Sequence, residues 1–353
     1  VIMNNFFDQP YYKWNKIFLS CMGIWPEQTL FMRRLMPVLI MISITSILIP
    51  EFIRLPAVWH DVDTFLECLP PLIVATITII QLFNGVFNHK KLGLMLDRMY
   101  EDWERIGDSS NLEILRTCAN QGSSFTKIYS AEYGVNSEDY YGMILTHMFL
   151  ISCVKIFVII SNDTMLFVLV KHACAIFKVV GANLEMIHFD KTDVCAVSSE
   201  NAYYKMICDC MHLHQQAIMF ADLIESTYTA SLLGVMLCSL VTLSISGLQV
   251  LMHLNEPGDV LRYASFSIAQ IFRLYLTSIP GQMLMDHSLS ILDRAYSVDW
   301  PDLPPRAQKL LIMIMMRSRR PCHITAGKIY KISTENYSSV QMTRFSYFIV
   351  SHG

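Results

Sequence analysis

The stretch LMPVLIMISITSILIP, residues 35–50, contains no charged side chain and lies within an apolar run from Leu35 to Ala57. A run of about 20 apolar residues can cross the ~30 Å hydrocarbon core of a membrane as a helix. The whole chain has the same character, since 53% of its 353 residues are hydrophobic and 16% are charged. Soluble domains carry about 25% charged residues. The composition therefore predicts an integral membrane protein.

Further apolar runs follow the first, and together they predict an all-α, polytopic membrane helical bundle with six recognisable spans. After the first run, these spans cover Phe65–Phe87, Met143–Val180, Thr227–Leu251, Tyr263–Leu284 and Ser333–Val350. The formal net charge of −3 indicates no nucleic acid partner.

The run from Met143 to Val180 is much longer than one bilayer crossing. It is either one helix that projects beyond the membrane or two short spans with a turn at Asn162-Asp163. Asp163 and Lys171 interrupt it. Ionisable residues at membrane depth suggest function, but on a projecting helix they would simply be solvated, and we favour that interpretation.

Basic residues predict the orientation, because Lys and Arg gather on the cytoplasmic side of membrane spans. Arg33 and Arg34 precede the first span, and Lys90 and Lys91 follow the second. The first nine residues lack the basic start of a cleaved signal peptide. We therefore expect a cytoplasmic N-terminus.

The last run is amphipathic, with Ser339, Thr343 and Ser346 on one helical face. A helix with a polar stripe at membrane depth needs water or polar neighbours there. A water-filled pore lined by this helix would supply them.

Several short motifs stand out near the two ends of the chain. The C-terminal ones are AYSVDW (295–300), QKLLIMIMMRSRRP (308–321), TAGKIY (325–330) and SYF (346–348), and the N-terminal ones are YYKWN (11–15) and GIWP (23–26). Together these motifs resemble those of insect odorant receptors. The resemblance implies an odorant-gated, non-selective cation channel in the plasma membrane of olfactory neuron dendrites, with an extracellular C-terminus, built as a hetero-tetramer with a co-receptor. It also implies a membrane bundle with an outer-half ligand pocket over residues 1–285. Residues 286–353 would then form cytoplasmic anchor helices and a pore-lining last helix whose hydrophobic gate is Val350.

Members of that family have seven spans, and the third has no counterpart here. Residues 105–140 contain no stretch able to cross a bilayer. Lys90 and Lys191 place the chain inside on both sides of a single long apolar region, although an even number of crossings must separate them. We therefore expect the third span to be missing near residues 130 and 131.

The family resemblance implies a largely apolar pocket in the outer half of the bundle for a small volatile organic ligand. Ordinary helix packing is the competing interpretation for each candidate. The candidate residues are Ile73 and Ile77, then Met148, Phe149 and Ser152, then Tyr263, Phe266 and Gln270.

The segment CDCMHLH, residues 208–214, pairs Cys208 with His212 and Cys210 with His214, but on different helix faces. Neither pair alone supplies the four ligands of a structural zinc site, so we expect no metal and no cofactor. Sequence motifs of enzyme active sites are also absent. The alternatives to a channel subunit are a non-conducting member of the same family and an unrelated membrane transporter.

Overall fold

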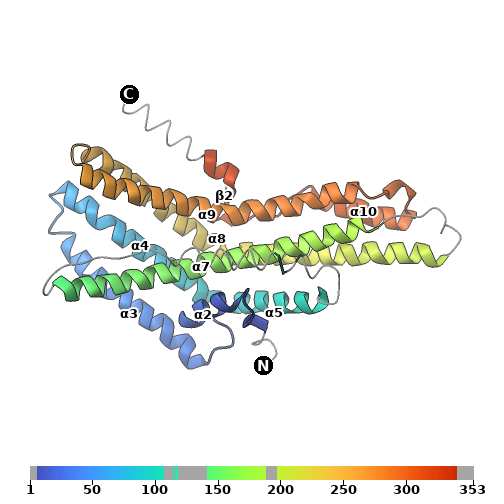
Figure 1. The fold of residues 1–353 in the computed structure, drawn as a ribbon, viewed down its shortest axis with the longest axis horizontal. Coiled ribbons are helices and arrows are strands. Elements are labelled where there is room, and N and C mark those ends of the chain that lie inside the picture. The colour runs from blue at the N-terminus through green and yellow to red at the C-terminus, as the bar shows by residue number, and fades with distance from the viewer. Residues whose placement is uncertain (1–5, 107–113, 115, 118–140, 188–196, 340–353) are drawn as a thin grey trace.

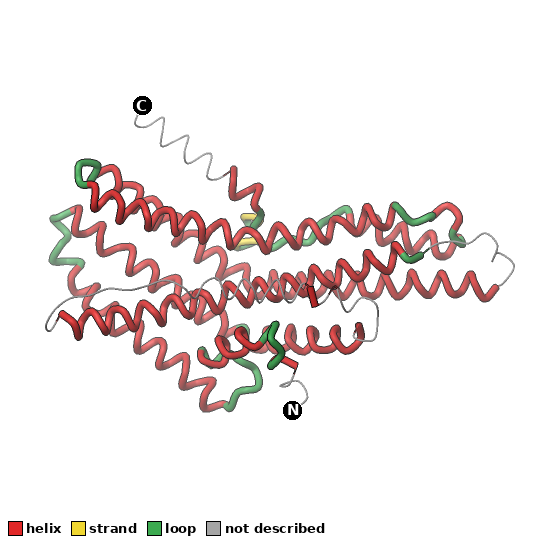
Figure 2. The backbone as a smooth tube through the Cα atoms, in the orientation of Figure 1, coloured by secondary structure: helices red, strands yellow, loops and turns green. Residues whose placement is uncertain are grey.

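The computed structural model describes residues 6–106, 114, 116–117, 141–187 and 197–339 (Figure 1). These residues form an elongated bundle of helices with one small hairpin (Figure 2), so the predicted all-α class is confirmed. The proposed gap near residues 130 and 131, and the candidates Thr343, Ser346 and Val350, lie outside the described residues.

The helices agree with the predicted runs but extend beyond several of them. Their bounds are α2 Lys13–Cys21, α3 Leu30–Arg54, α4 Val62–Phe87, α5 His89–Ile106, α7 Tyr141–Glu185, α8 Val197–Met252, α9 Pro257–Tyr296, the 3₁₀ turn η2 Trp300–Asp302 and α10 Pro305–Ser318. Within the described part of the chain, α3, α4, and most of α7 and α8 are long and apolar enough to span a membrane. The predicted span in α9 is more polar and is not among them.

The long apolar run forms one uninterrupted helix, which decides between the two alternatives for Met143–Val180. Helix α7 has 45 residues and α8 has 56. At 1.5 Å per residue these helices are about 68 and 84 Å long, far more than a hydrocarbon core.

Local sequence signals explain where several helices begin. The side chain of Thr29 accepts a hydrogen bond from the Met32 N–H at the start of α3, and Asp61 accepts one from the Asp63 N–H at the start of α4. Pro257 and Pro305 occupy the first turns of α9 and α10, where a missing N–H costs nothing.

The bundle has two distinct ends (Figure 1). The turn end holds the α3–α4 link, the α8–α9 turn and the start of α7. The α10 end holds α10, the end of α7 and the start of α8, while α5 lies alongside the middle of the bundle. Near the turn end, Phe149 and Leu150 of α7 are 46% and 57% exposed, whereas nearly every residue from Met165 to Val180 is buried. The core is thus densest toward the α10 end.

The N-terminal segment packs on α5 through a cluster of aromatic rings. Phe6 lies 5.6 Å from Trp103, measured between ring centroids, and the Trp103 indole N–H donates to the Tyr12 hydroxyl at 3.1 Å. A buried indole normally needs such a partner.

Candidate functional site

The pocket candidates on α4 and α9 face the inside of the bundle. Ile77 and Gln270 are buried, while Ile73 and Phe266 are half-buried. On α7, Phe149 and Ser152 are exposed, and the side chain of Met148 is outside the description. The predicted α7 wall is therefore the least enclosed, and the assignment of all these residues to a pocket stays a prediction.

Tyr263 has a structural role that the sequence does not reveal. Its hydroxyl donates to the Glu67 carboxylate, which also accepts from Arg262 at 2.6 Å. These bonds join α9 to α4 at the turn end.

On three helices, the face that carries a pocket candidate continues to a polar side chain, and these three polar side chains meet. Ile77 of α4 leads one turn on to Gln81, Phe266 of α9 leads two turns on to Arg273, and Ser152 of α7 leads three turns on to Asp163. We call Gln81, Asp163 and Arg273 the floor cluster.

Both carboxylate oxygens of Asp163 face partners in the floor cluster. Gln81 Nε2 donates to Asp163 Oδ1 at 3.0 Å, and Arg273 Nε lies 3.8 Å from Asp163 Oδ2. The expectation that Asp163 is merely solvated is therefore wrong, because helices distant in sequence place an amide and a guanidinium beside it. An ion pair at membrane depth also removes much of the cost of each charge.

Helix α8 contributes a polar seam that sequence reasoning missed. This seam consists of the buried side chains of Ser239, Thr242, Ser246 and Gln249. Arg273 Nη1 of α9 reaches Ser239 Oγ at 3.5 Å, and Ser267 donates to Ser246 at 2.8 Å. The spacing i, i+3, i+7, i+10 within an apolar run was the signal that could have found it.

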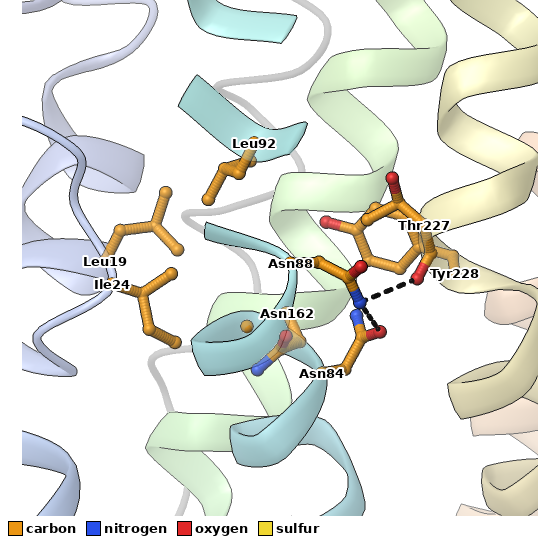
Figure 3. A pocket seen from close by; sticks show the side chains of 9 residues that line it. Leu19, Ile24, Asn84, Asn88, Leu92, Asn162, Thr227 and Tyr228 are labelled. Atoms are coloured by element: carbon orange, nitrogen blue, oxygen red, sulfur yellow. Dashed lines mark hydrogen bonds between the residues drawn. The ribbon is translucent and has the colours of Figure 1, made fainter. Parts of the chain in front are cut away.

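A small pocket lies one turn beyond the floor cluster, toward the α10 end (Figure 3). It is lined by Leu19, Ile24, Asn84, Gly85, Asn88, Leu92, Asn162, Thr227 and Tyr228. Asn88 donates to Asn84 at 2.9 Å and to the Thr227 carbonyl at 3.4 Å. The space fits about one water molecule, so it suits a bound water and not an odorant. Asn162 also begins the sequence Asn162-Asp163-Thr164, which matches the N-glycosylation motif, and its burial argues against use of that motif.

The last helix begins against α9. Residues 334–339 are helical, the Tyr337 hydroxyl donates to the Ile271 carbonyl at 3.0 Å, and the Tyr337 ring lies 5.8 Å from Tyr275. Ser339 is exposed and donates to the Glu335 carbonyl at 3.1 Å. Ile271 and Tyr275 flank Arg273, so the last helix starts at the level of the floor cluster.

A hairpin holds this start in place. Strands β1 Thr325–Ala326 and β2 Tyr330–Lys331 pair in antiparallel fashion, and the Gly327 N–H donates to the Thr229 carbonyl of α8 at 2.8 Å. Gly327 has a φ of +62°, a conformation that favours glycine.

The cysteine- and histidine-rich segment of α8 packs into the helix core. Cys210 and His214 are buried, and the His214 ring lies 6.0 Å from Phe177. No group of three or more metal-ligating side chains is found in the part of the chain that the structure describes.

Comparison with known proteins identifies the fold and its relatives. A sequence profile described as "7tm Odorant receptor" matches residues 128–347, more than half of the chain. The chain belongs to the insect odorant receptor family. It is thus a multi-pass membrane protein from a family of receptors, not of enzymes.

Curated odorant receptors resemble parts of this receptor chain. Odorant receptor 9a of Drosophila melanogaster is 26% identical over 53% of this chain and 45% of its own length. The odorant receptor coreceptor of Aedes aegypti is 29% identical over 39% of this chain and 29% of its own length. The alignments thus span less than half the length of these relatives.

The receptor's fold matches a solved structure from end to end. The insect olfactory receptor OR5 from Machilis hrabei, in complex with eugenol, superposes with a TM-score of 0.71, at 14% identity, over 96% of both chains. A second structure of the same Machilis hrabei receptor superposes with a TM-score of 0.68.

Proposed function

We propose that this receptor chain is a tuning subunit of an odorant-gated, non-selective cation channel, assembled with an odorant co-receptor as a hetero-tetramer. The profile match over residues 128–347 carries the proposal. Similarity to both a tuning receptor and co-receptors supports it. The ligand would be a small volatile organic molecule held in the half of the bundle near the turn end, and lipid would surround the exposed apolar faces.

The proposed conducting element is the last helix. Its first turns lie against α9, which also carries Phe266, Gln270 and Arg273. A ligand that displaces α9 would therefore act directly on the start of the pore helix. Ser339, Thr343 and Ser346 would line the lumen, and Val350 would form an apolar constriction that blocks ions by dewetting.

A non-conducting member of the same family is the second candidate function. The observation that favours it is the lack of any membrane-crossing stretch in residues 105–140. Without a third span, the ligand pocket would lose a wall.

The test is odorant-evoked current in cells that express this chain, the co-receptor, or both. The channel proposal expects no current from this chain alone and a weak odorant-dependent current with the co-receptor, above that of the co-receptor alone. A panel of odorants that never exceeds the co-receptor control would favour the non-conducting alternative. Robust current from this chain without a co-receptor would contradict the proposed assembly.

A further inference from the structure

We infer that the floor cluster binds the hydroxyl group of an alcohol or phenol ligand. The inference rests on the proposed function, because it names the ligand class of the proposed odorant pocket. It starts from buried polar atoms of Gln81, Gln270 and Arg273 that have no hydrogen-bond partner among the described residues.

The guanidinium of Arg273 is under-satisfied among the described residues. Its Nε and Nη2 atoms are buried and have no hydrogen-bond partner there, because the 3.8 Å contact with Asp163 is too long for a hydrogen bond. Nη1 makes only the 3.5 Å contact with Ser239. A buried donor without a partner is costly, particularly on a charged group.

Unpaired acceptors lie on α4 and on α9, the helices that carry Gln81 and Arg273. Gln81 is 5% exposed and Gln270 is 8% exposed, and in both the Oε1 atom is buried without a partner in the described part of the chain. Gln81 and Arg273 contact the two oxygens of one carboxylate. The unpaired donors of Arg273 and the unpaired Oε1 of Gln81 are therefore near enough to bond to the same small group.

The combination selects a neutral hydroxyl. Asp163 already balances the charge of Arg273, so the cluster does not require an anionic ligand. A hydroxyl oxygen accepts from Arg273 and its hydrogen donates to Gln81, whereas an ether or ester oxygen can only accept. Ile77 and Phe266, on the same faces toward the turn end, suit an apolar body.

The experiment measures binding to the purified full chain in lipid nanodiscs, using phenol and its near-isostere toluene as probes. Ligand-induced shifts in thermal unfolding give the two affinities. Because its hydroxyl would bond to a charged group, phenol should bind about 10- to 100-fold more tightly than toluene. Anisole, which accepts but cannot donate, should fall between them.

Matched variants locate the effect. The double variant Asp163→Leu/Arg273→Met removes both charges, so no unpaired charge is left inside the bundle, and phenol should then bind no better than toluene. Gln81→Leu should weaken phenol binding by about tenfold and leave toluene unchanged. Arg262→Met, on the same helix but at the turn end, should keep the full preference for phenol.

Equal binding of phenol and toluene by the unaltered chain, or binding of neither, would overturn the inference, as would an undiminished preference in the double variant. If the floor cluster held only water, phenol and toluene would bind equally. Selective phenol binding without any current in co-expressing cells would refute the channel function and leave the hydroxyl site standing. Currents evoked equally by phenol and toluene would support the channel function and contradict the hydroxyl site.

Discussion

At the scale of single residues, Cys322 shows how burial suppresses reactivity. Its backbone N–H donates to Ser288 Oγ at 2.9 Å, and burial raises the pKa of its thiol to about 11, although the nearby Arg317 acts in the opposite direction. Because the thiolate is the nucleophile, about one thiol in a thousand is reactive at pH 8. Maleimide labelling of the solubilised protein at pH 8, followed by peptide mass spectrometry, should modify the exposed Cys21 at least ~100-fold faster. Comparable rates would show that Cys322 is accessible, and labelling of Cys322 should accelerate as the pH approaches 11.

Val350 is proposed to form the constriction of the pore, and a substitution there tests that role. Val350→Ser should raise the resting cation leak, because a polar ring at the constriction no longer excludes water. Whole-cell current is measured with the co-receptor present and with a family third span inserted near residue 130, and Ser346→Cys should react with water-soluble thiol reagents when odorant is applied. Unchanged leak together with an unreactive Ser346→Cys would mean that this helix does not line the conduction path.

At the scale of elements, Gly281 lets the segment before the last helix lie directly on α9. A Cβ atom at Gly281 would fall 2.0 Å from the Ile332 carbonyl oxygen, whereas one at Gly247 of α8 would meet nothing within 4 Å. Gly281→Ala should therefore destabilise the protein by about 1–3 kcal/mol through overpacking, and Gly247→Ala should be neutral or slightly stabilising. Thermal unfolding in detergent compares the two. Equal stability of the two variants would mean that the segment before the last helix does not lie directly on α9.

Sequence predicts the elements well because their signals are local. The apolar runs gave most of the long helices, and the Pro304-Pro305 pair is a local signal that marks the start of α10. The floor cluster is not local, since Gln81 and Asp163 are 82 residues apart. No periodicity within α7 could show which residue of α4 or α9 would face Asp163, and the solvated interpretation failed for that reason. The α8 seam, by contrast, was readable from its own spacing.

At the scale of the whole molecule, charge predicts how the bundle is inserted. Lys90 and Lys91 stand at the start of α5, where Lys91 contacts Ser226 midway along α8. The basic residues of α10 and its flank lie beyond them at the α10 end, so this end should face the cytoplasm. An epitope tag before Val1 should stain only in permeabilised cells, and a tag after Gly353 should stain on intact cells. Staining of the first tag on intact cells would reverse the proposed orientation.

The unbroken length of α7 has a mechanical consequence. A stiff rod of about 68 Å acts as a lever, and a tilt of about 3° around its midpoint moves each tip by roughly 2 Å in opposite directions. Shifts of 1–2 Å between packed helices are large enough to switch an interface from one arrangement to another. Helix α7 contacts α9 and α8 along its course. A displacement of one end of α7 would therefore move the other end directly, without a relay from residue to residue.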